Sequence, residues 1–445
     1  MRRAVAACTL VLALLAAAPA PAQERPRFDA RLLAKVPVPG YPAQAYTHPN
    51  GRIYEGTYTN PSGDSLRSRV FEYSADGTLL RSWTVPGQDL SAEHGTQVAT
   101  SDARGRLVLL DRTPARMLLL DLGTGEFTQV ASFPDLPACP GGEPQPGCSP
   151  TLGDRPPMPN YAAWGPDGSL YVTDYLQGVV WRIPPGGGEP AVWLADRKLD
   201  GDMFGTTGID LAADRRTLLI SQQSSGGGGD GNPSTGKLYS VAIQPDGSPG
   251  PMQALWESGP VDGPDGFGIA TSGRIYLALL STNQLVVLEA DGSEIERVSS
   301  PLFDSPSNAA FLGTSVIVAN QSFVEGNPDN WSLVDVAVGE TGLEELIPGR
   351  DTVAPRLSRV RVTRKRRGVR FRLSEPAVVE VAVDRRRRGR WVRKRTIERS
   401  RKAGRRSIRF GRRLPAGRYR VVLEAADEGG NDSRPRRRRF RVRRR

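Results

Sequence analysis

Histidine, cysteine and aromatic residues are scarce in this chain of 445 residues, and each shortage narrows the functions that it supports. The two histidines, His48 and His94, each stand alone in the sequence. A lone histidine is more often a solvated or capping residue than a catalytic base, so no histidine-centred site is expected. The Gly-x-Ser-x-Gly pattern is absent, so the chain shows no nucleophile elbow of the serine-hydrolase type.

Helical periodicity and long apolar runs are missing beyond the first twenty residues, so no later segment is expected to span a membrane. The N-terminus itself has two arginines, an apolar core over residues 4–18 and the small-residue triplet Ala20-Pro21-Ala22. This pattern predicts a signal peptide over residues 1–22 and an exported protein, whether secreted, periplasmic or held at the cell surface. An uncleaved N-terminal anchor is the alternative.

Removal of the signal peptide would leave two cysteines, Cys139 and Cys148, at the ends of the stretch CPGGEPQPGC. An even pair of cysteines in an exported chain predicts a disulfide. A metal-binding pair is the alternative, but no histidine or further cysteine lies nearby in the sequence.

Glycine (49 residues) and proline (37 residues) are abundant, and they punctuate a repeat. A strand, a tight polar turn and a second strand recur in six copies, which begin at Gly40, Glu93, Pro159, Thr206, Pro264 and Ser305. Each copy is followed by a second hairpin, and the sixth of these is interpreted as SLVDVAVGETGLEELI, from Ser332. Four strands in each of six units predict an all-β fold, a six-bladed β-propeller over residues 23–350. A pair of β-sandwiches would not explain six matching copies.

The alternating strand directions of a propeller place the start of each innermost strand on one face, which we call the upper face. The loops between second and third strands and the connections between blades lie there too. The Cys139–Cys148 loop and the glycine-rich segment 222–236 are therefore expected to rim or cover the upper mouth of the channel. The stretch GNPSTGK, ending at Lys237, nearly spells a phosphate-binding loop. A strand rather than a helix is expected after it, so no nucleotide cofactor is predicted.

Three stretches, PN…PDGSLYVTD, TTGIDLAADRRTLLIS and PDGFGIATSGRIYLAL, resemble the regucalcin/gluconolactonase family of six-bladed propellers. The resemblance covers residues 40–348; strictosidine-synthase-like and repeat-type binding propellers remain alternatives. The family implies a lactonase that holds one divalent cation at the channel mouth, with a Glu from blade one, an Asn from blade four and an Asp from blade five as ligands. It also implies an Asn in blade three that lines the substrate pocket.

The residue eight positions before the turn glycine, or before its equivalent, gives the corresponding positions in this chain, which are Ala43, Gln97, Asn160, Thr207 and Asp265. Blade six has a shortened turn, and its nearest counterpart is Asn308. By resemblance, Asp265 is the candidate catalytic carboxylate, and Asp265 and Asn160 are the candidate metal ligands. Asn160, Gln97, Thr207 and Asn308 are the candidate substrate-binding residues for a small-molecule ligand.

Ala43 and Thr207 replace two usual metal ligands, whereas Ca²⁺, the expected cation, prefers about six oxygen ligands, including carboxylates. Zn²⁺ and Mn²⁺ are alternatives, and Glu55 and Asp174 are possible compensating carboxylates. An Asp-Gly pair at a strand entry also commonly caps a turn, so a structural role for Asp265 stays open. His48 is expected on the lower face, and His94 within reach of the upper mouth.

The composition changes at residue 351. Residues 351–445 contain 36 Lys plus Arg and 9 Asp plus Glu, a net charge of +27, whereas residues 1–350 carry −15. About seven alternating segments predict an immunoglobulin-like β-sandwich over residues 351–445. Its charge favours binding to an anionic cell-envelope polymer. The alternatives are a solvated arginine-rich face and an intramolecular contact with the acidic propeller.

Two functions are therefore in competition. One is an exported, metal-assisted hydrolase that opens a sugar lactone or another small lactone. The other is a non-catalytic propeller that binds a glycan or small ligand and is held at the cell surface by its basic domain.

Overall fold

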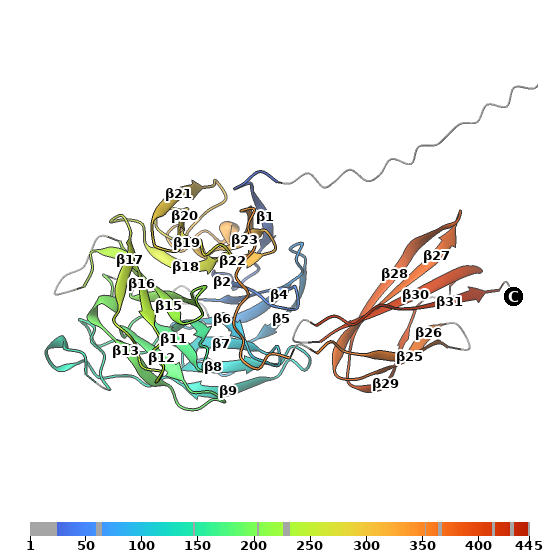
Figure 1. Ribbon diagram of the computed structural model, residues 1–445, viewed down its shortest axis with the longest axis horizontal. Helices are drawn as coiled ribbons and strands as arrows, with labels where there is room; N and C mark the ends of the chain where they lie inside the picture. The colour runs from blue at the N-terminus through green and yellow to red at the C-terminus, as the bar shows by residue number, and fades with distance from the viewer. Residues whose placement is uncertain are drawn as a thin grey trace, which may run out of the picture.

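The computed structural model describes residues 25–58, 65–145, 147–202, 204–225, 232–351, 353–363, 367–411, 414–427 and 431–443 (Figure 1). The signal peptide predicted over residues 1–22 lies outside these ranges. Nearly all regular structure in them is β-strand, and the short exceptions are the single-turn helices η1 (Pro140–Gly142), η2 (Arg197–Leu199) and η3 (Pro328–Asn330). None of the helices in the described ranges has the length and apolar character needed to cross a bilayer.

Five blades of the propeller follow one another along the chain as four-stranded antiparallel sheets (Figure 1). From the channel outward, the strands are β2 (Pro42–Thr47), β3 (Ile53–Thr57), β4 (Arg69–Tyr73) and β5 (Leu79–Thr84) in blade one; β6 (Thr96–Ser101), β7 (Leu107–Arg112), β8 (Ala115–Leu120) and β9 (Phe127–Ser132) in blade two; β10 (Pro159–Trp164), β11 (Leu170–Asp174), β12 (Val179–Ile183) and β13 (Ala191–Ala195) in blade three; β14 (Thr206–Leu211), β15 (Thr217–Ser225), β16 (Thr235–Ala242) and β17 (Gln253–Glu257) in blade four; and β18 (Pro264–Ile269), β19 (Ile275–Leu279), β20 (Gln284–Leu288) and β21 (Glu294–Ser299) in blade five. The six-bladed prediction is confirmed.

Blade six closes the ring with a strand from the other end of the propeller. Its first three strands are β22 (Pro306–Leu312), β23 (Ser315–Asn320) and β24 (Ser332–Ala337), and its outer strand is β1 (Ala30–Lys35). The prediction that GLEELI would supply the outer strand of this blade was wrong. The strand β1 precedes the first copy of the repeat and is not followed by the tight polar turn that marks each copy. The repeat pattern therefore did not reveal it.

Apolar layers between neighbouring blades form the propeller core. Between blades two and three, for example, Leu110 and Met117 pack with Val172 and Trp181 in one cluster of buried side chains. Because each middle strand has a blade on both of its faces, strands such as β7 and β19 are buried over almost their whole length. This packing fixes the inner strands around the channel and therefore positions whatever they carry at its mouth.

Residues 341–350 lie across the lower end of the channel instead of forming a strand of blade six. Gly342 forms a bridge with Ala270 at the end of β18, and Glu345 enters the channel, where Tyr46 Oη donates a hydrogen bond to it (2.8 Å). The inner strands and this segment, which we call the lower strap, enclose a cavity of about 490 Å³. Burial raises the pKa of the Glu345 carboxyl to about 7.

The basic segment folds as two facing sheets around one apolar core. One sheet has the order β25-β26-β29 and the other β28-β27-β30-β31. The strands are β25 (Leu357–Val362), β26 (Gly368–Leu373), β27 (Ala377–Arg387), β28 (Arg390–Arg401), β29 (Gly404–Arg409), β30 (Gly417–Ala426) and β31 (Arg436–Val442). Tyr419, near the start of β30, donates a hydrogen bond to the carbonyl of Pro415 (2.8 Å), as the tyrosine corner of immunoglobulin-like domains does. That bond and the strand order support the immunoglobulin-like assignment, which stays a prediction.

The sandwich meets the lower face of the propeller through its four-stranded sheet (Figure 1). Arg52, in the β2–β3 turn, forms an ion pair with Glu398 of β28 (3.1 Å). The amide of Asp351 also donates a hydrogen bond to the carbonyl of Ala103 (3.3 Å). The boundary predicted at residues 350/351 falls in the segment between β24 and β25. The three-stranded sheet makes neither of these contacts.

Candidate functional site at the upper mouth

The residues singled out by counting lie where the inner strands depart from regular pairing. In five of the six blades the register between first and second strands shifts at this level, for example between Pro42 and Ala45 in blade one and between Pro264 and Phe267 in blade five. In blade two the shift comes slightly later, between Val98 and Thr100. Such irregularities free side chains from the sheet and are common beside functional sites. The structure thus brings these six residues to one level around the channel.

Hydrogen bonds between neighbouring blades connect most of this ring. Gln97 Nε2 donates to Asn160 Oδ1 (2.6 Å), and Thr207 Oγ1 bonds to Ser221 Oγ (2.9 Å) and to the carbonyl of Pro264 (3.3 Å). The Asn308 amide exchanges two hydrogen bonds with the backbone of Ala45 (3.0 and 3.1 Å). These contacts give Asn160, Thr207 and Asn308 a part in closing the ring. The binding roles expected for them stay predictions.

Asp265 is the one ionisable residue of the six, and it is buried, with 4% of its surface exposed. Ser307 Oγ donates a hydrogen bond to its Oδ2 (2.8 Å), the Gly266 amide is a further donor, and the Tyr161 hydroxyl lies within hydrogen-bonding reach. Loss of solvation outweighs these donors and raises the pKa of Asp265 to about 7. At neutral pH this carboxyl is therefore poised between its protonated and ionised forms.

Tyr161 forms the floor of the site. Its hydroxyl reaches across the channel from blade three to the carbonyl of Ser307 in blade six (3.0 Å), and it also approaches the carbonyl of Ala43 (3.4 Å). A side chain at Gly266 would collide with that hydroxyl, because an added Cβ would lie 2.6 Å from it. The tyrosine thereby separates the upper mouth from the cavity above the lower strap, which it also lines.

An aromatic cluster above Asp265 was missed by the sequence prediction. Tyr58 and Tyr175 pack with Met158 and Ala43, and the ring of Phe204 stacks on Tyr175 with a centroid distance of 4.6 Å. Burial raises the pKa of both tyrosines, and the charge of Asp265 raises it further, which shows that they lie near this carboxyl. Both tyrosines directly follow second strands, in GTY and TDY, so the same counting applied to β3 and β11 would have found them.

Among the described residues, one donor and one acceptor at this level lack a strong hydrogen-bond counterpart. The Tyr58 hydroxyl donates to the Met158 sulfur (3.6 Å), a weak acceptor, and the buried Gln97 Oε1 accepts no hydrogen bond from the described residues. An unmatched acceptor in a buried site is costly unless water or a ligand meets it. The mouth therefore offers one donor and one acceptor to a bound molecule.

The residues present at the upper mouth do not fit a six-oxygen cation site. Ala43 supplies no ligand atom, and the Thr207 hydroxyl and the Asn160 oxygen are already hydrogen-bonded within the ring. The groups that shift the pKa of Asp265 include no second carboxylate. Among the described residues, a hard divalent cation would therefore find a single carboxylate here.

Neither of the two carboxylates proposed as substitutes completes such a site. Asp174 is fully buried and accepts hydrogen bonds from the amides of Met158, Leu176 and Gln177 and from the Trp181 indole. Glu55 is also fully buried, among side chains between blades, and burial alone raises its pKa. Its two carboxyl oxygens accept no hydrogen bond from the described residues.

Both histidines have structural positions. His94 is buried, and its ring nitrogens face the carbonyls of Ala92 (2.9 Å) and Leu66 (2.6 Å), so it joins two connections of the upper face. His48 lies in the lower-face turn between β2 and β3, and burial lowers its pKa to about 4. Neither ring points to a catalytic role.

An acidic triad, Asp351, Glu375 and Asp427, lies in the basic segment, and its carboxylate oxygens are all within 4.8 Å of one another. Asp351 is exposed, and the Asp427 carboxylate accepts hydrogen bonds from Asn431. The triad lies on the sandwich side of the chain and contributes nothing to the upper mouth.

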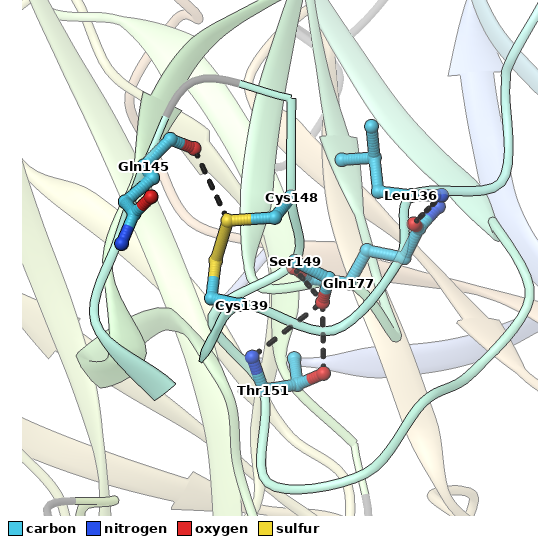
Figure 2. Close-up of a disulfide and its surroundings, with 7 residues drawn as sticks. All are labelled: Leu136, Cys139, Gln145, Cys148, Ser149, Thr151 and Gln177. Carbon is cyan, nitrogen blue, oxygen red and sulfur yellow. Dashed lines mark hydrogen bonds between the residues drawn. A yellow bond between two sulfur atoms is a disulfide. The ribbon is translucent and has the colours of Figure 1, made fainter. Parts of the chain in front are cut away.

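The predicted disulfide between Cys139 and Cys148 is formed, and it closes a loop on the upper face (Figure 2). Ser149 Oγ next to it donates a hydrogen bond to the carbonyl of Gln177 (2.9 Å), and Gln177 Oε1 accepts the amide of Leu136 (2.8 Å). These contacts fasten both ends of the loop to blade three.

Comparison with known proteins gives a family match over most of the propeller. A sequence profile of the SMP-30/Gluconolactonase/LRE-like region matches residues 64–317, which is more than half of the chain. No curated protein matches the sequence.

Among solved structures, a calcium-binding protein, regucalcin, from Agrobacterium tumefaciens is similar, with 16% sequence identity and a TM-score of 0.52. The match covers 72% of this chain and 97% of that one. A gluconolactonase from Xanthomonas campestris has 18% identity and a TM-score of 0.47, over 70% of this chain and 90% of its own. At these identities the structural likeness shows the fold alone.

Proposed function

Because the chain belongs to the SMP-30/gluconolactonase/LRE-like family, we propose that its propeller is a lactonase-like hydrolase with Asp265 as the acid–base group. The observation that carries the proposal is the buried Asp265 carboxyl, whose pKa is raised to about 7 beneath an aromatic cluster. A general base is most effective when its pKa lies near the working pH.

The chain's own groups are suited to the two steps of ring opening. Ionised Asp265 accepts a proton from water as the water oxygen attacks the lactone carbonyl. Protonated Asp265 then returns the proton to the ring oxygen as the C–O bond breaks, so the product is a hydroxy acid. The Tyr58 hydroxyl, which donates to the weakly accepting Met158 sulfur, is the donor available to the carbonyl oxygen. No step is assigned to a metal, because the ligand atoms present do not fit one.

The mouth favours an apolar lactone over a sugar lactone. Its lining includes Tyr58, Tyr175 and Phe204, and large apolar side chains are exposed on the surrounding upper-face loops. These exposed residues are Leu66 (46%), Leu152 (47%), Val261 (60%), Phe323 (37%) and Val324 (64%). A polyhydroxylated ring would bury several hydroxyls against such a surface with few partners.

The test is turnover of a lactone panel, from gluconolactone to alkyl-substituted γ- and δ-lactones, by purified protein in the presence of a chelator. We expect hydrolysis of the apolar members, with kcat/KM rising through pH 7 as Asp265 ionises. Asp265→Asn should lower kcat by at least about 100-fold. Glu345→Gln, the same change at the lower end of the channel, is the matched control and should retain activity. Absence of turnover across the panel, or an Asp265→Asn variant as active as the parent, would refute the assignment.

A non-catalytic binding propeller is the second candidate. It is favoured by the ring of hydrogen bonds that already engages Asn160, Thr207 and Asn308. Under this alternative, apolar ligands would raise the melting temperature of the protein without being converted. Export of the chain is retained as a proposal that rests on the pattern of residues 1–22.

A further inference from the structure

Arginine is the main residue type on the outer face of the sheet β25-β26-β29. Alternate residues such as Val369, Phe371 and Ile408 point into the sandwich core and are buried. The residues between them point outward. On that face five exposed arginines are joined by two serines and a glycine, namely Arg361, Arg370, Arg372, Arg405, Arg409, Ser358, Ser407 and Gly368. We call the five arginines the arginine face.

No carboxylate neutralises the arginine face. The three strands contain neither Asp nor Glu, and among the described residues none of the five guanidinium groups has an ion pair with a carboxylate. The opposite sheet differs, because the buried Asp384 there pairs with Arg393 (2.7 Å) and Arg420 (2.8 Å). The arginine face therefore has no carboxylate partner among the described residues, whereas the opposite sheet holds a buried carboxylate that pairs with two of its arginines.

Cross-strand register brings these charges close together. Arg370 lies opposite Arg361 on β25, and Arg372 lies opposite Arg405 on β29. Directly opposed side chains on one sheet face have Cβ atoms about 5 Å apart, and like charges in such pairs destabilise a sheet. Positions that oppose stability in this way without a local compensating contact are characteristic of functional surfaces.

We propose that the arginine face binds an extended phosphodiester polymer that lacks bases, such as a polyol-phosphate chain. Arginines two residues apart on one strand, such as Arg370 and Arg372, are separated by about 6.7 Å, a spacing that suits successive phosphates of an extended chain. Each guanidinium presents a planar pair of N–H donors that matches a phosphate. The two serine hydroxyls add neutral donors.

The absence of an aromatic side chain from this face distinguishes the occupant from a nucleic acid. Binding of single strands usually relies on aromatic rings that stack on the bases. Trp391 lies in the other sheet, where Arg420 and Arg439 stand 5.0 and 5.8 Å from its ring. The acidic propeller of the same chain is not the occupant of the arginine face either. Its ion pair with the sandwich joins Arg52 to Glu398, which lies on the opposite, four-stranded sheet.

The experiment uses the full chain and compares two triple variants with equal loss of charge. The test variant is Arg370→Gln/Arg372→Gln/Arg405→Gln. The matched control is Arg386→Gln/Arg387→Gln/Arg390→Gln, at the exposed tip of the β27–β28 hairpin. Binding of purified poly(glycerol phosphate) is measured by fluorescence anisotropy at several salt concentrations. Oligo-dT and polygalacturonate with matched numbers of charges serve as competing probes.

We expect the test variant to bind poly(glycerol phosphate) roughly tenfold or more weakly and to reduce the slope of log K against log salt by about 2. The control should stay close to the parent in both quantities, and the melting temperature of the test variant should not fall, because repulsion has been removed. Equal losses in the two variants would overturn the proposal in favour of unspecific attraction to the whole basic segment. Tighter arginine-dependent binding of oligo-dT or of polygalacturonate would overturn it in favour of nucleic acid or of a carboxylate polymer.

Discussion

Replacement of Asp265 by asparagine should change how propeller stability depends on pH. Asn keeps the shape of the side chain and its acceptor for Ser307 but cannot ionise. Burial raises the pKa of Asp265 from 3.8 to about 7, so the folded chain holds this proton more tightly than the unfolded chain does. An acid with a raised pKa contributes stability that is lost as the pH rises through the window from 3.8 to about 7.

The magnitude follows from the part of that window which the experiment crosses. Between pH 5 and pH 7 the unfolded chain has already released the proton and the folded chain has not, and each pH unit there corresponds to about 1.4 kcal/mol. Relative to the parent, Asp265→Asn should therefore gain on the order of 3 kcal/mol of unfolding free energy between pH 5 and pH 8. Other groups that titrate in this range cancel in the difference between the two proteins.

Tryptophan fluorescence during urea denaturation is a suitable assay, because six of the seven tryptophans lie in the propeller and one, Trp391, in the sandwich. The unfolding free energies of parent and variant are measured at pH 5 and at pH 8. Parallel pH profiles for the two proteins would refute the reasoning, because they would show that the Asp265 carboxyl is either solvated or already ionised in the folded chain.

Two further predictions concern other parts of the chain. Glu345, whose pKa is raised to about 7, should ionise above that pH and loosen the lower strap. The protection factors of the amides over residues 341–347, taken relative to the intrinsic exchange rate at each pH, should therefore fall between pH 6 and pH 8 in the parent and stay constant in Glu345→Gln; an equal fall in both would contradict the role of this carboxyl. Tyr419→Phe removes the hydrogen bond to the carbonyl of Pro415 and should lower the unfolding free energy of the sandwich by about 1 kcal/mol, measured by calorimetry; no change in that transition would show that the bond contributes nothing.

The propeller was predictable because its signal is repeated six times, and each copy constrains the others. The outer strand of blade six was not predictable in this way. The strand β1 is a single, largely exposed strand before the first repeat, and only its pairing with β24 assigns it to a blade. The lower strap was mistaken for a strand for the same reason. Its alternating residues fit a hairpin locally, but the edge that it would have joined was already occupied by β1.

At the mouth, counting residues from the turns identified the residues at one level of the channel. It did not identify Tyr161, the side chain that crosses the channel there. Ala43 and Asp265 lie within irregular stretches of their inner strands, and Asn308 lies at the edge of one. The position of Tyr161 as a floor depends on a side chain long enough to reach the opposite blade and on the missing Cβ of Gly266. Such an arrangement involves residues 105 positions apart and has no periodic signature.

The pairing of β1 with β24 has a consequence for the order of events during synthesis. Ala30 pairs with Val336, so the first strand to leave the ribosome waits for one of the last strands of the ring. Five blades can assemble as they emerge, but the ring stays open until translation has passed residue 337. An N-terminal tag or a retained leader would sit directly against this closing strand, whereas a C-terminal tag would only lengthen the arginine-rich end.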